Sequence, residues 1–303
     1  MRNAMSWIRA RYLYFIGFYF SIAIVSLELG IRYIVLGEPR LFDYSEVTGW
    51  RLKPNLNIQR RDHYGSWNVV TDLDGNRSIL DSNYNIPNWI ILGDSFAFGE
   101  GVNIDQRFDA VNTFLQDSSI NFGVPGYSPL QAFLRINESS FEINGNTSIL
   151  LLVYKNDIQD SIQYHSAYRK RPILNAEDII EYPNSFLDHI HGFLRDSSYV
   201  YYSLLLYVLK PDVELTVANF ISNLRFITGS FSNEVHVVFH GFHIDNLSEY
   251  LNSNLCKEIR CHVFEASRES RPELYIQGDA HWNALGHKAF SDFLTDFVVG
   301  QLD

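Results

Sequence analysis

Cysteine is scarce in this 303-residue chain, and runs of like charge are missing. Its two cysteines, Cys256 and Cys261, are too few for a disulfide framework and have no metal-site partners at the usual spacings. They form a bridge if they face an oxidising compartment, or else stay as two unpaired thiols. Charged residues make up 19% of the chain and hydrophobic residues 46%, which argues against wholesale disorder.

A basic surface is also missing. The formal net charge is -11, and the one basic cluster, residues 168–171, is too short to form the positive stripe of a nucleic-acid binder. We therefore expect no nucleic-acid partner. The sequence contains no internal repeat or low-complexity tract, and its length and apolar fraction are enough to bury the core of one large domain.

A long hydrophobic run lies near the N-terminus. Residues 12–27 carry no charge, and the apolar stretch continues past Glu28 to Val35. A bilayer span needs about 20 mostly apolar residues, a length that this segment reaches if Glu28 lies at the membrane interface. Three arginines precede the run and no small-residue cleavage motif follows it, which favours an uncleaved signal anchor with a cytoplasmic N-terminus. A buried or interfacial helix is the alternative.

Composition divides the chain into three predicted segments. We expect a membrane anchor over residues 1–37, a small strand-and-loop segment packed on the main domain over 38–87, and the main domain over 88–303. Within the main domain, residues 158–210 resemble an insertion that is rich in aromatic side chains. The insertion is either a helical hairpin that completes the core or a lid over the substrate, and packing is the commoner use of such aromatics.

Three continuous aliphatic runs in the main domain, Trp89–Leu92, Ile149–Val153 and Val235–Phe239, are typical of strands buried on both faces. Strands that alternate with helices predict an α/β fold, in which helices cover both sides of a central parallel sheet. Functional side chains then gather beyond the carboxyl ends of the strands. The expected helices cover residues 107–116, 129–136, 213–230 and 284–298.

The first of these strands ends in Gly93-Asp94-Ser95. Gly93 permits tight backbone geometry at the strand end. Ser95 is then expected at the carboxyl edge of the sheet, near a helix N-terminus, where nearby N–H groups are able to stabilise an oxyanion. Alternatively, Ser95 is only the N-cap of that helix.

Two further loops carry candidate oxyanion donors. Gly126 lies between Pro125 and Tyr127 and is placed to present an unobstructed N–H, although such a sequence also forms a simple β-turn. Asn156 follows the second predicted strand, so its side-chain amide is placed to donate to an oxyanion. The alternative is that Asn156 caps the next helix.

The fourth loop, residues 278–287, precedes the last predicted helix. His281 is suited to accept a proton from a serine hydroxyl, and Asp279 is suited to hold its imidazole in the required tautomer. We expect His287, on the last helix, to be structural. A metal site formed by Asp279, His281 and His287 is an alternative, but no further ligand is evident, and we expect neither a metal nor another cofactor.

These four loops, taken in order, resemble the motif blocks of the SGNH hydrolase superfamily, also called GDSL-type esterases, over about residues 88–297 apart from the insertion. The matching residues are Gly93-Asp94-Ser95, Gly126, Asn156-Asp157, and Asp279 with His281.

The resemblance implies a three-layer α/β/α sandwich of the flavodoxin-like kind and an acyl-Ser95 intermediate. It also implies an oxyanion hole formed by the N–H groups of Ser95 and Gly126 and by the Asn156 amide. One residue separates Asp279 from His281 where the family commonly has two, so a backbone carbonyl is an alternative partner for the imidazole. The Asp-x-His-Trp sequence also resembles the corresponding block of bacterial polysaccharide O-acetylation proteins.

The resemblance therefore implies a serine esterase that removes acyl groups, acetyl in particular, from a glycan or another envelope ester. The alternatives are an O-acyltransferase that modifies a cell-surface polysaccharide and a non-catalytic glycan-binding protein. The expected partners are an acyl-ester substrate, in particular a carbohydrate, and the membrane. The expected location is the bacterial inner membrane, with a single span and a periplasmic or otherwise extracytoplasmic catalytic domain.

Overall fold

The computed structural model describes most of the main domain and the N-terminal helix. Most of the predicted insertion over 158–210 lies outside the described residues. The described residues are 2–35, 41–62, 65–77, 87–139, 141, 143–161, 171–175, 177, 179–182, 214–242, 256 and 259–299.

A parallel sheet of five strands forms the centre of the domain, in the order β11-β10-β7-β5-β6. The chain enters the sheet at β5, moves to one side for β6, and then crosses to the other side for β7, β10 and β11. The winding therefore reverses between β5 and β7, and ligands of doubly wound folds bind at the carboxyl ends of the strands on either side of such a reversal. The strands are β5 (Trp89–Leu92), β6 (Ser119–Asn121), β7 (Ser148–Tyr154), β10 (Val235–His240) and β11 (Arg260–Phe264).

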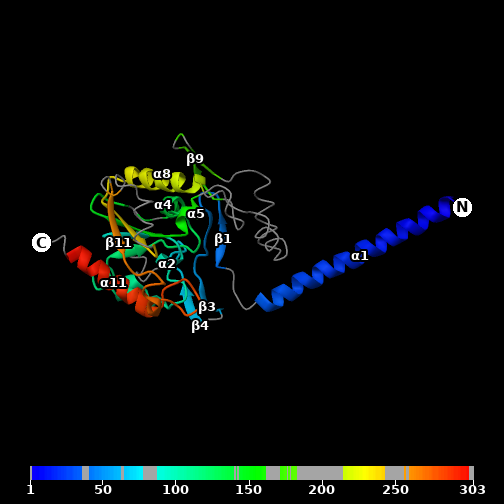
Figure 1. Cartoon of the computed structure of the whole chain (residues 1–303), viewed down its shortest axis with the longest axis horizontal. Coiled ribbons are helices and arrows are strands. Elements are labelled where there is room, and N and C mark those ends of the chain that lie inside the picture. The colour runs from blue at the N-terminus through cyan, green and yellow to red at the C-terminus, as the bar shows by residue number, and fades with distance from the viewer. Residues whose placement is uncertain are drawn as a thin grey trace.

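Helices cover both faces of this sheet, with α8 and α11 on opposite sides (Figure 1). Because successive side chains of a strand point to opposite faces, β7 contributes to two separate clusters. Leu151 packs in the cluster that contains Phe220 of α8, and Leu152 packs in the one that contains Phe290 of α11. The predicted α/β fold with a central parallel sheet is confirmed.

The helices of the domain are mostly short. The prediction of one helix over 107–116 is wrong, because the chain leaves the helix at Asn112, whose side-chain oxygen accepts hydrogen bonds from the N–H groups of Phe114 and Leu115. The α-helices are α2 (Ser95–Phe98), α3 (Phe108–Val111), α4 (Pro129–Arg135), α5 (Asp157–Asp160), α8 (Glu214–Ser230) and α11 (Ala284–Val299), and the 3₁₀ turns are η1 (Ile104–Gln106), η2 (Ile136–Glu138) and η3 (Pro272–Leu274).

Two antiparallel hairpins precede the sheet along the chain. Trp50 of β2 and Trp67 of β4 are buried and belong to the same core cluster as Leu151 of β7. The division of the chain into three segments stays a prediction. The hairpin strands are β1 (Phe42–Ser45), β2 (Gly49–Leu52), β3 (Asn57–Asp62) and β4 (Gly65–Val70), and a small pair, β8 (Ile173–Leu174) and β9 (Ile180–Glu181), lies later in the chain.

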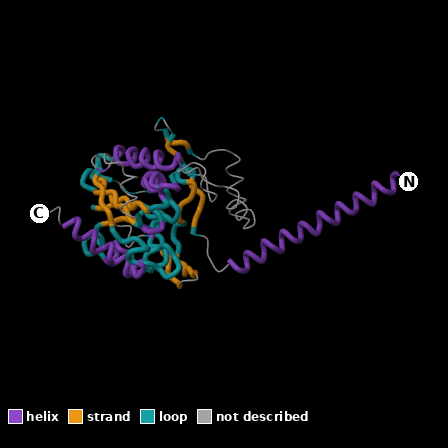
Figure 2. The backbone as a smooth tube through the Cα atoms, in the orientation of Figure 1, coloured by secondary structure: helices purple, strands orange, loops and turns teal. Residues whose placement is uncertain are grey.

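The N-terminal hydrophobic run forms one long helix, α1 (Arg2–Val35). Its 19-residue stretch Arg11–Leu29 is long and apolar enough to cross a membrane, and none of that stretch is buried against the rest of the chain. Figures 1 and 2 show α1 standing apart from the sheet and its helices. The alternative of a helix buried in the core is therefore wrong. The membrane span stays a prediction that rests on length and composition, and the interfacial helix stays its alternative.

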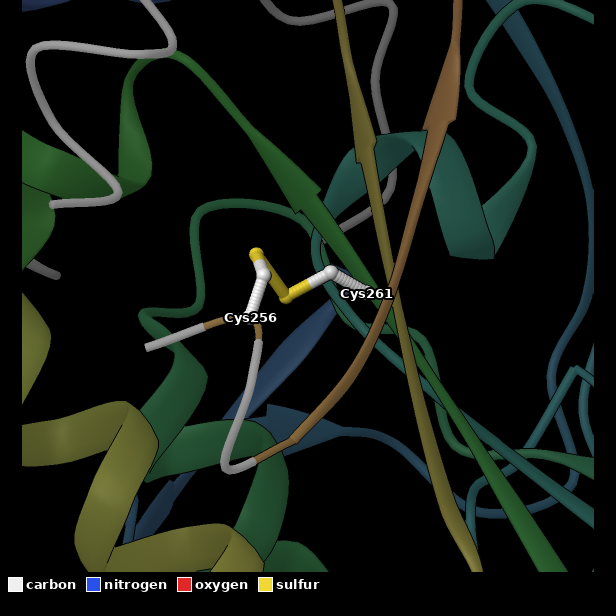
Figure 3. The surroundings of a disulfide bond; sticks show 2 residues. All are labelled: Cys256 and Cys261. Atoms are coloured by element: carbon white, nitrogen blue, oxygen red, sulfur yellow. A yellow bond between two sulfur atoms is a disulfide. The ribbon is translucent and has the colours of Figure 1, made fainter. Parts of the chain in front are cut away.

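Cys256 and Cys261 form a disulfide bond, with their Cα atoms 5.3 Å apart (Figure 3). Cys261 lies in β11, so the bond ties this edge strand to the segment that precedes it. Of the two alternatives for these residues, the structure shows the bridge.

Candidate active site

Ser95 is positioned by the end of β5 and the start of α2. A side chain at Gly93 would place a Cβ atom 2.9 Å from the Cβ of Ala97 and 3.2 Å from the carbonyl oxygen of Leu152, so only glycine fits this turn. The Asp94 carboxylate accepts a hydrogen bond from the Phe96 N–H at 2.9 Å and caps the helix. Ser95 is therefore the first helical residue, and the alternative that Ser95 is the N-cap is wrong.

His281 lies in a loop that is fixed at several points before α11. Its carbonyl oxygen accepts a hydrogen bond from the Ile276 N–H at 2.9 Å. The Asn283 side chain donates to the carbonyl oxygens of Glu273 and Tyr275, at 2.9 Å each. Between His281 and Asn283, the Trp282 ring is fully buried. These contacts leave the imidazole little freedom to move relative to the sheet.

The structure brings Ser95, His281 and Asp279 into one chain of contacts, although Ser95 is 186 positions before His281. The Ser95 Oγ lies 2.8 Å from His281 Nε2, and His281 Nδ1 lies 2.6 Å from the Asp279 carboxylate. With Nδ1–H donating to Asp279, Nε2 is left as a hydrogen-bond acceptor facing the serine hydroxyl. Asp279 therefore occupies the place that the sequence left open for a backbone carbonyl. The catalytic roles of the three residues stay a prediction.

Electrostatics at this contact favour an ionised Asp279. The hydrogen bond from His281 outweighs partial burial and lowers the pKa of Asp279 to about 2. Burial lowers the pKa of His281, but the hydrogen bond and charge of Asp279, with the charges of Glu100 and Asp94, more than offset this and raise it. The imidazole thus has a carboxylate partner that favours its protonated form.

An aromatic cluster supports the histidine from behind. The Phe96 ring centroid lies 5.3 Å from that of His281 and 4.9 Å from that of Trp282. His240, at the end of β10, packs 4.5 Å from Phe96, and burial lowers its pKa to about 3, so it stays neutral. Sequence reasoning missed this cluster, because its members come from α2, the end of β10 and the loop before α11, which are distant along the chain.

Gly126 is the third residue of a turn that begins at Val124. The Tyr127 N–H donates to the Val124 carbonyl at 3.2 Å, and Gly126 has a φ of 77°. Proline in the second position and glycine in the third fit a type II turn, so the β-turn alternative is correct. The turn is compatible with the predicted role, since the Gly126 N–H donates no hydrogen bond within the described part of the chain.

Asn156 follows β7, the neighbour of β5. Its Nδ2 donates to the Asp160 carboxylate at 3.0 Å, and its side-chain oxygen is buried without a hydrogen-bond partner among the described residues. An N-cap would accept through that oxygen, so the capping alternative is wrong. Within the described residues, no direct hydrogen bond joins Asn156 or Gly126 to Ser95. The oxyanion hole therefore stays a prediction.

Two buried carboxylates accompany the motif residues. Burial raises the pKa of Asp94 to about 6, although the Phe96 N–H and the nearby imidazolium of His281 act in the opposite direction. Burial, followed by the charge of Asp94, raises the pKa of Asp157. Sequence reasoning assigned neither residue a function. The available signal was their position, directly before Ser95 and directly after Asn156.

The alternative metal site is not assembled. His287 is buried in α11, where its ring stacks on Phe108 at 6.1 Å between centroids and lies edge-on to Trp282 at 5.6 Å. Burial lowers the pKa of His287, which keeps the ring neutral. No group of three or more His, Cys, Asp or Glu side chains in the described ranges is arranged to hold a metal ion. His287 is thus a packing residue rather than a third ligand beside Asp279 and His281.

No protein-family model and no curated protein matches this chain. Among solved structures, the chain is similar to an acetyl xylan esterase (Est2A) from the rumen bacterium Butyrivibrio proteoclasticus, with a TM-score of 0.37 and 10% sequence identity. The similarity covers 74% of this chain and 66% of the length of that chain. A likeness at this level says nothing of activity, so the geometry of the site has to support any functional proposal.

Proposed function

We propose that this protein is a membrane-anchored serine esterase with Ser95 as the nucleophile, His281 as the general base and Asp279 as the residue that orients the imidazole. The observation that supports this proposal is the unbroken contact from the Ser95 Oγ through both ring nitrogens of His281 to the Asp279 carboxylate. The site lies where the winding of the sheet reverses, next to β5 and β7.

Acylation follows from this geometry. His281 Nε2 accepts the hydroxyl proton as the Ser95 Oγ attacks the ester carbonyl, and Asp279 stabilises the imidazolium that forms. The carbonyl oxygen becomes an oxyanion, for which the expected donors are the N–H groups of Ser95 and Gly126 and the Asn156 amide. As the tetrahedral intermediate collapses, His281 donates its proton to the leaving alcohol and the acyl group remains on Ser95.

Deacylation repeats these steps with water. The His281 side chain is 25% exposed, so water reaches the imidazole. His281 accepts a proton from the water molecule that attacks the acyl carbonyl, and then returns a proton to the Ser95 oxygen as the carboxylic acid leaves.

The proposed location follows from two features of the chain, helix α1 and the disulfide bond. Helix α1 is suited to anchor the protein in a bilayer. The disulfide between Cys256 and Cys261 fits an oxidising compartment, so we place the esterase domain on the extracytoplasmic side of a bacterial inner membrane. An ester carried by an envelope glycan is the substrate that this location and the motif resemblance favour.

Labelling with a fluorophosphonate tests the proposed nucleophile. We expect one phosphonyl adduct on the peptide that contains Ser95, and the same adduct in the Ser66→Ala variant, which loses only an exposed serine of β4. The Ser95→Ala variant should not be labelled. An adduct on another residue, or a folded wild-type chain that does not react at all, would contradict the proposal.

A further inference from the structure

Arg171 is the one residue of the basic cluster 168–171 that the structure describes, and it is buried, with its side chain 5% exposed. Its guanidinium donates to the Asp160 carbonyl oxygen at 2.7 Å and pairs with the Asp160 carboxylate at 3.0 Å. Taking a charge out of water is costly unless it is paired, so these two contacts fix Arg171 against the end of α5.

The same carboxylate holds Asn156. One Asp160 oxygen pairs with Arg171, and the other accepts the hydrogen bond from Asn156 Nδ2 at 3.0 Å. The four-residue spacing from Asn156 to Asp160 places both side chains on one face of the α5 turn. A continuous contact therefore runs from a buried guanidinium through a carboxylate to the predicted oxyanion donor.

This contact decides which way the Asn156 amide points. An ionised carboxylate only accepts hydrogen bonds, so a flipped amide would place its oxygen against the negative charge of Asp160. The amide oxygen is buried without a hydrogen-bond partner in the part of the chain that the structure describes, so it offers no competing restraint. One N–H of the amide is used by Asp160, and a hydrogen bond from the same amide also acts on the buried carboxylate of Asp94, directly before Ser95, and lowers its pKa.

Arg171 also contacts Trp50, which packs on the turn that carries Gly126, the other predicted oxyanion donor. The guanidinium lies over the Trp50 ring, 5.5 Å from the centroid. Trp50 in turn donates from its indole N–H to the Pro125 carbonyl at 3.2 Å, and its ring lies 3.7 Å from where a Cβ on Gly126 would be. One buried cation thus contacts the supports of both Asn156 and Gly126.

We propose that Asp160 and Arg171 are positioning residues, which hold the Asn156 amide in the orientation that donates to the oxyanion. The inference rests on the proposed esterase function, and neither residue touches the substrate. Arg171 belongs to the predicted insertion, so part of that segment acts in the reaction through Asn156 rather than as a lid.

The test uses the full chain in detergent and an aryl acetate as the substrate. An amide at position 160 has only one acceptor oxygen and is unable to serve both Arg171 and Asn156, so Asp160→Asn should lower kcat by about 10- to 100-fold with KM unchanged. Arg171→Lys keeps the charge but loses the two-point contact, and should lower kcat in the same way. Asp292→Asn, which breaks an exposed ion pair on α11, is the matched control and should leave kcat unchanged.

A double-mutant cycle separates positioning from a general loss of structure. If Asp160 acts through Asn156, adding Asp160→Asn to Asn156→Ala should change kcat by less than about 2-fold, since the donor is already gone. The same reduction in both backgrounds, or unchanged kcat in the folded Asp160→Asn and Arg171→Lys variants, would overturn the inference while Ser95-dependent activity remains. If Asp160→Asn fails to show a thermal unfolding transition, Arg171→Lys decides. Failure of the proposed function would give a different result: Ser95→Ala would turn over the ester as fast as the wild type. In that case the inference about Asp160 and Arg171 is refuted as well.

Discussion

Asp279 differs from the two other acidic side chains next to the motif residues in the direction of its pKa shift. The hydrogen bond from His281 lowers the pKa of Asp279 to about 2, whereas burial raises the pKa of Asp94 to about 6 and that of Asp157 as well. At neutral pH, Asp279 is therefore fully ionised beside the imidazole. This is the state that a triad needs from its carboxylate.

The pH dependence of the reaction should report this pair. Because the base has to be neutral, kcat/KM should fall as the pH falls through the pKa of His281, which lies above its ordinary value of 6.5. In Asp279→Asn the two largest contributions that raise this pKa, the hydrogen bond and the charge of Asp279, are lost or weakened while burial still lowers it, so the acidic limb should move to lower pH. The plateau should drop by about 10²- to 10⁴-fold. An acidic limb at the same pH in both proteins would show that Asp279 does not act on His281.

Asp94 should decrease stability at neutral pH. Its pKa is about 6 in the folded chain against 3.8 for a free side chain, so folding favours the protonated form, and stability falls as the pH rises from about 4 to above 6. Asp94→Asn keeps an oxygen that accepts from the Phe96 N–H but removes the charge. At pH 7.5 its unfolding free energy should exceed that of the wild type by up to about 3 kcal/mol, and its thermal midpoint should be higher accordingly.

Acidification provides the check on this prediction. At pH 4 the wild-type carboxyl is protonated in the folded chain, so the advantage of Asp94→Asn should largely disappear. The exposed Asp292→Asn variant should follow the wild type across the same range. An Asp94→Asn midpoint that lies below the wild type at pH 7.5 would contradict the burial cost assigned to Asp94.

At the scale of elements, the turn after β6 packs directly on α2. A Cβ on Gly123 would lie 2.4 Å from the Phe98 nitrogen and 2.6 Å from the Ala97 carbonyl carbon, which are backbone atoms that cannot yield as a side chain does. Gly123→Ala should therefore cost at least about 2 kcal/mol of unfolding free energy. Gly145→Ala, whose Cβ meets nothing within 4 Å, should stay within about 0.5 kcal/mol of the wild type in thermal or denaturant unfolding. Equal midpoints for the two variants would mean that the turn after β6 does not pack on the backbone of α2 at Gly123.

The elements that could be predicted from sequence are those with a continuous pattern. Strands β5 and β7 are continuous apolar runs, β10 keeps a mostly apolar run around His236, and all three were predicted correctly. Strand β11 was missed because it lies at the edge of the sheet, where Arg260 and His262 interrupt the apolar pattern. For the site, the ordered motifs predicted that Ser95, His281 and Asp279 meet. The contact between Asp160 and Arg171 has no signature in the sequence, because a separation of 11 positions matches no regular helix or strand spacing.

At the scale of the whole molecule, the prediction that α1 anchors the chain in a membrane is tested by cell fractionation. We expect the full chain to remain in the membrane fraction through high-salt and alkaline washes. Replacing both Phe18 and Ile22 by arginine places two charges near the centre of the span, at a cost of about 2.5–3.5 kcal/mol each. That variant should move to the soluble fraction, whereas the matched variant with leucine at both positions should not. A wild-type chain that is released by salt alone would show that α1 does not span the bilayer.

The central claim is that the hydroxyl of Ser95 performs the chemistry, and the most direct measurement is the rate of aryl-acetate hydrolysis by the full chain with and without that hydroxyl. Ser95→Ala leaves His281 and Asp279 in place and removes only the attacking oxygen. Its kcat/KM should fall by at least about 10³-fold at an unchanged thermal midpoint. A folded Ser95→Ala protein that hydrolyses the ester as fast as the wild type would contradict the account.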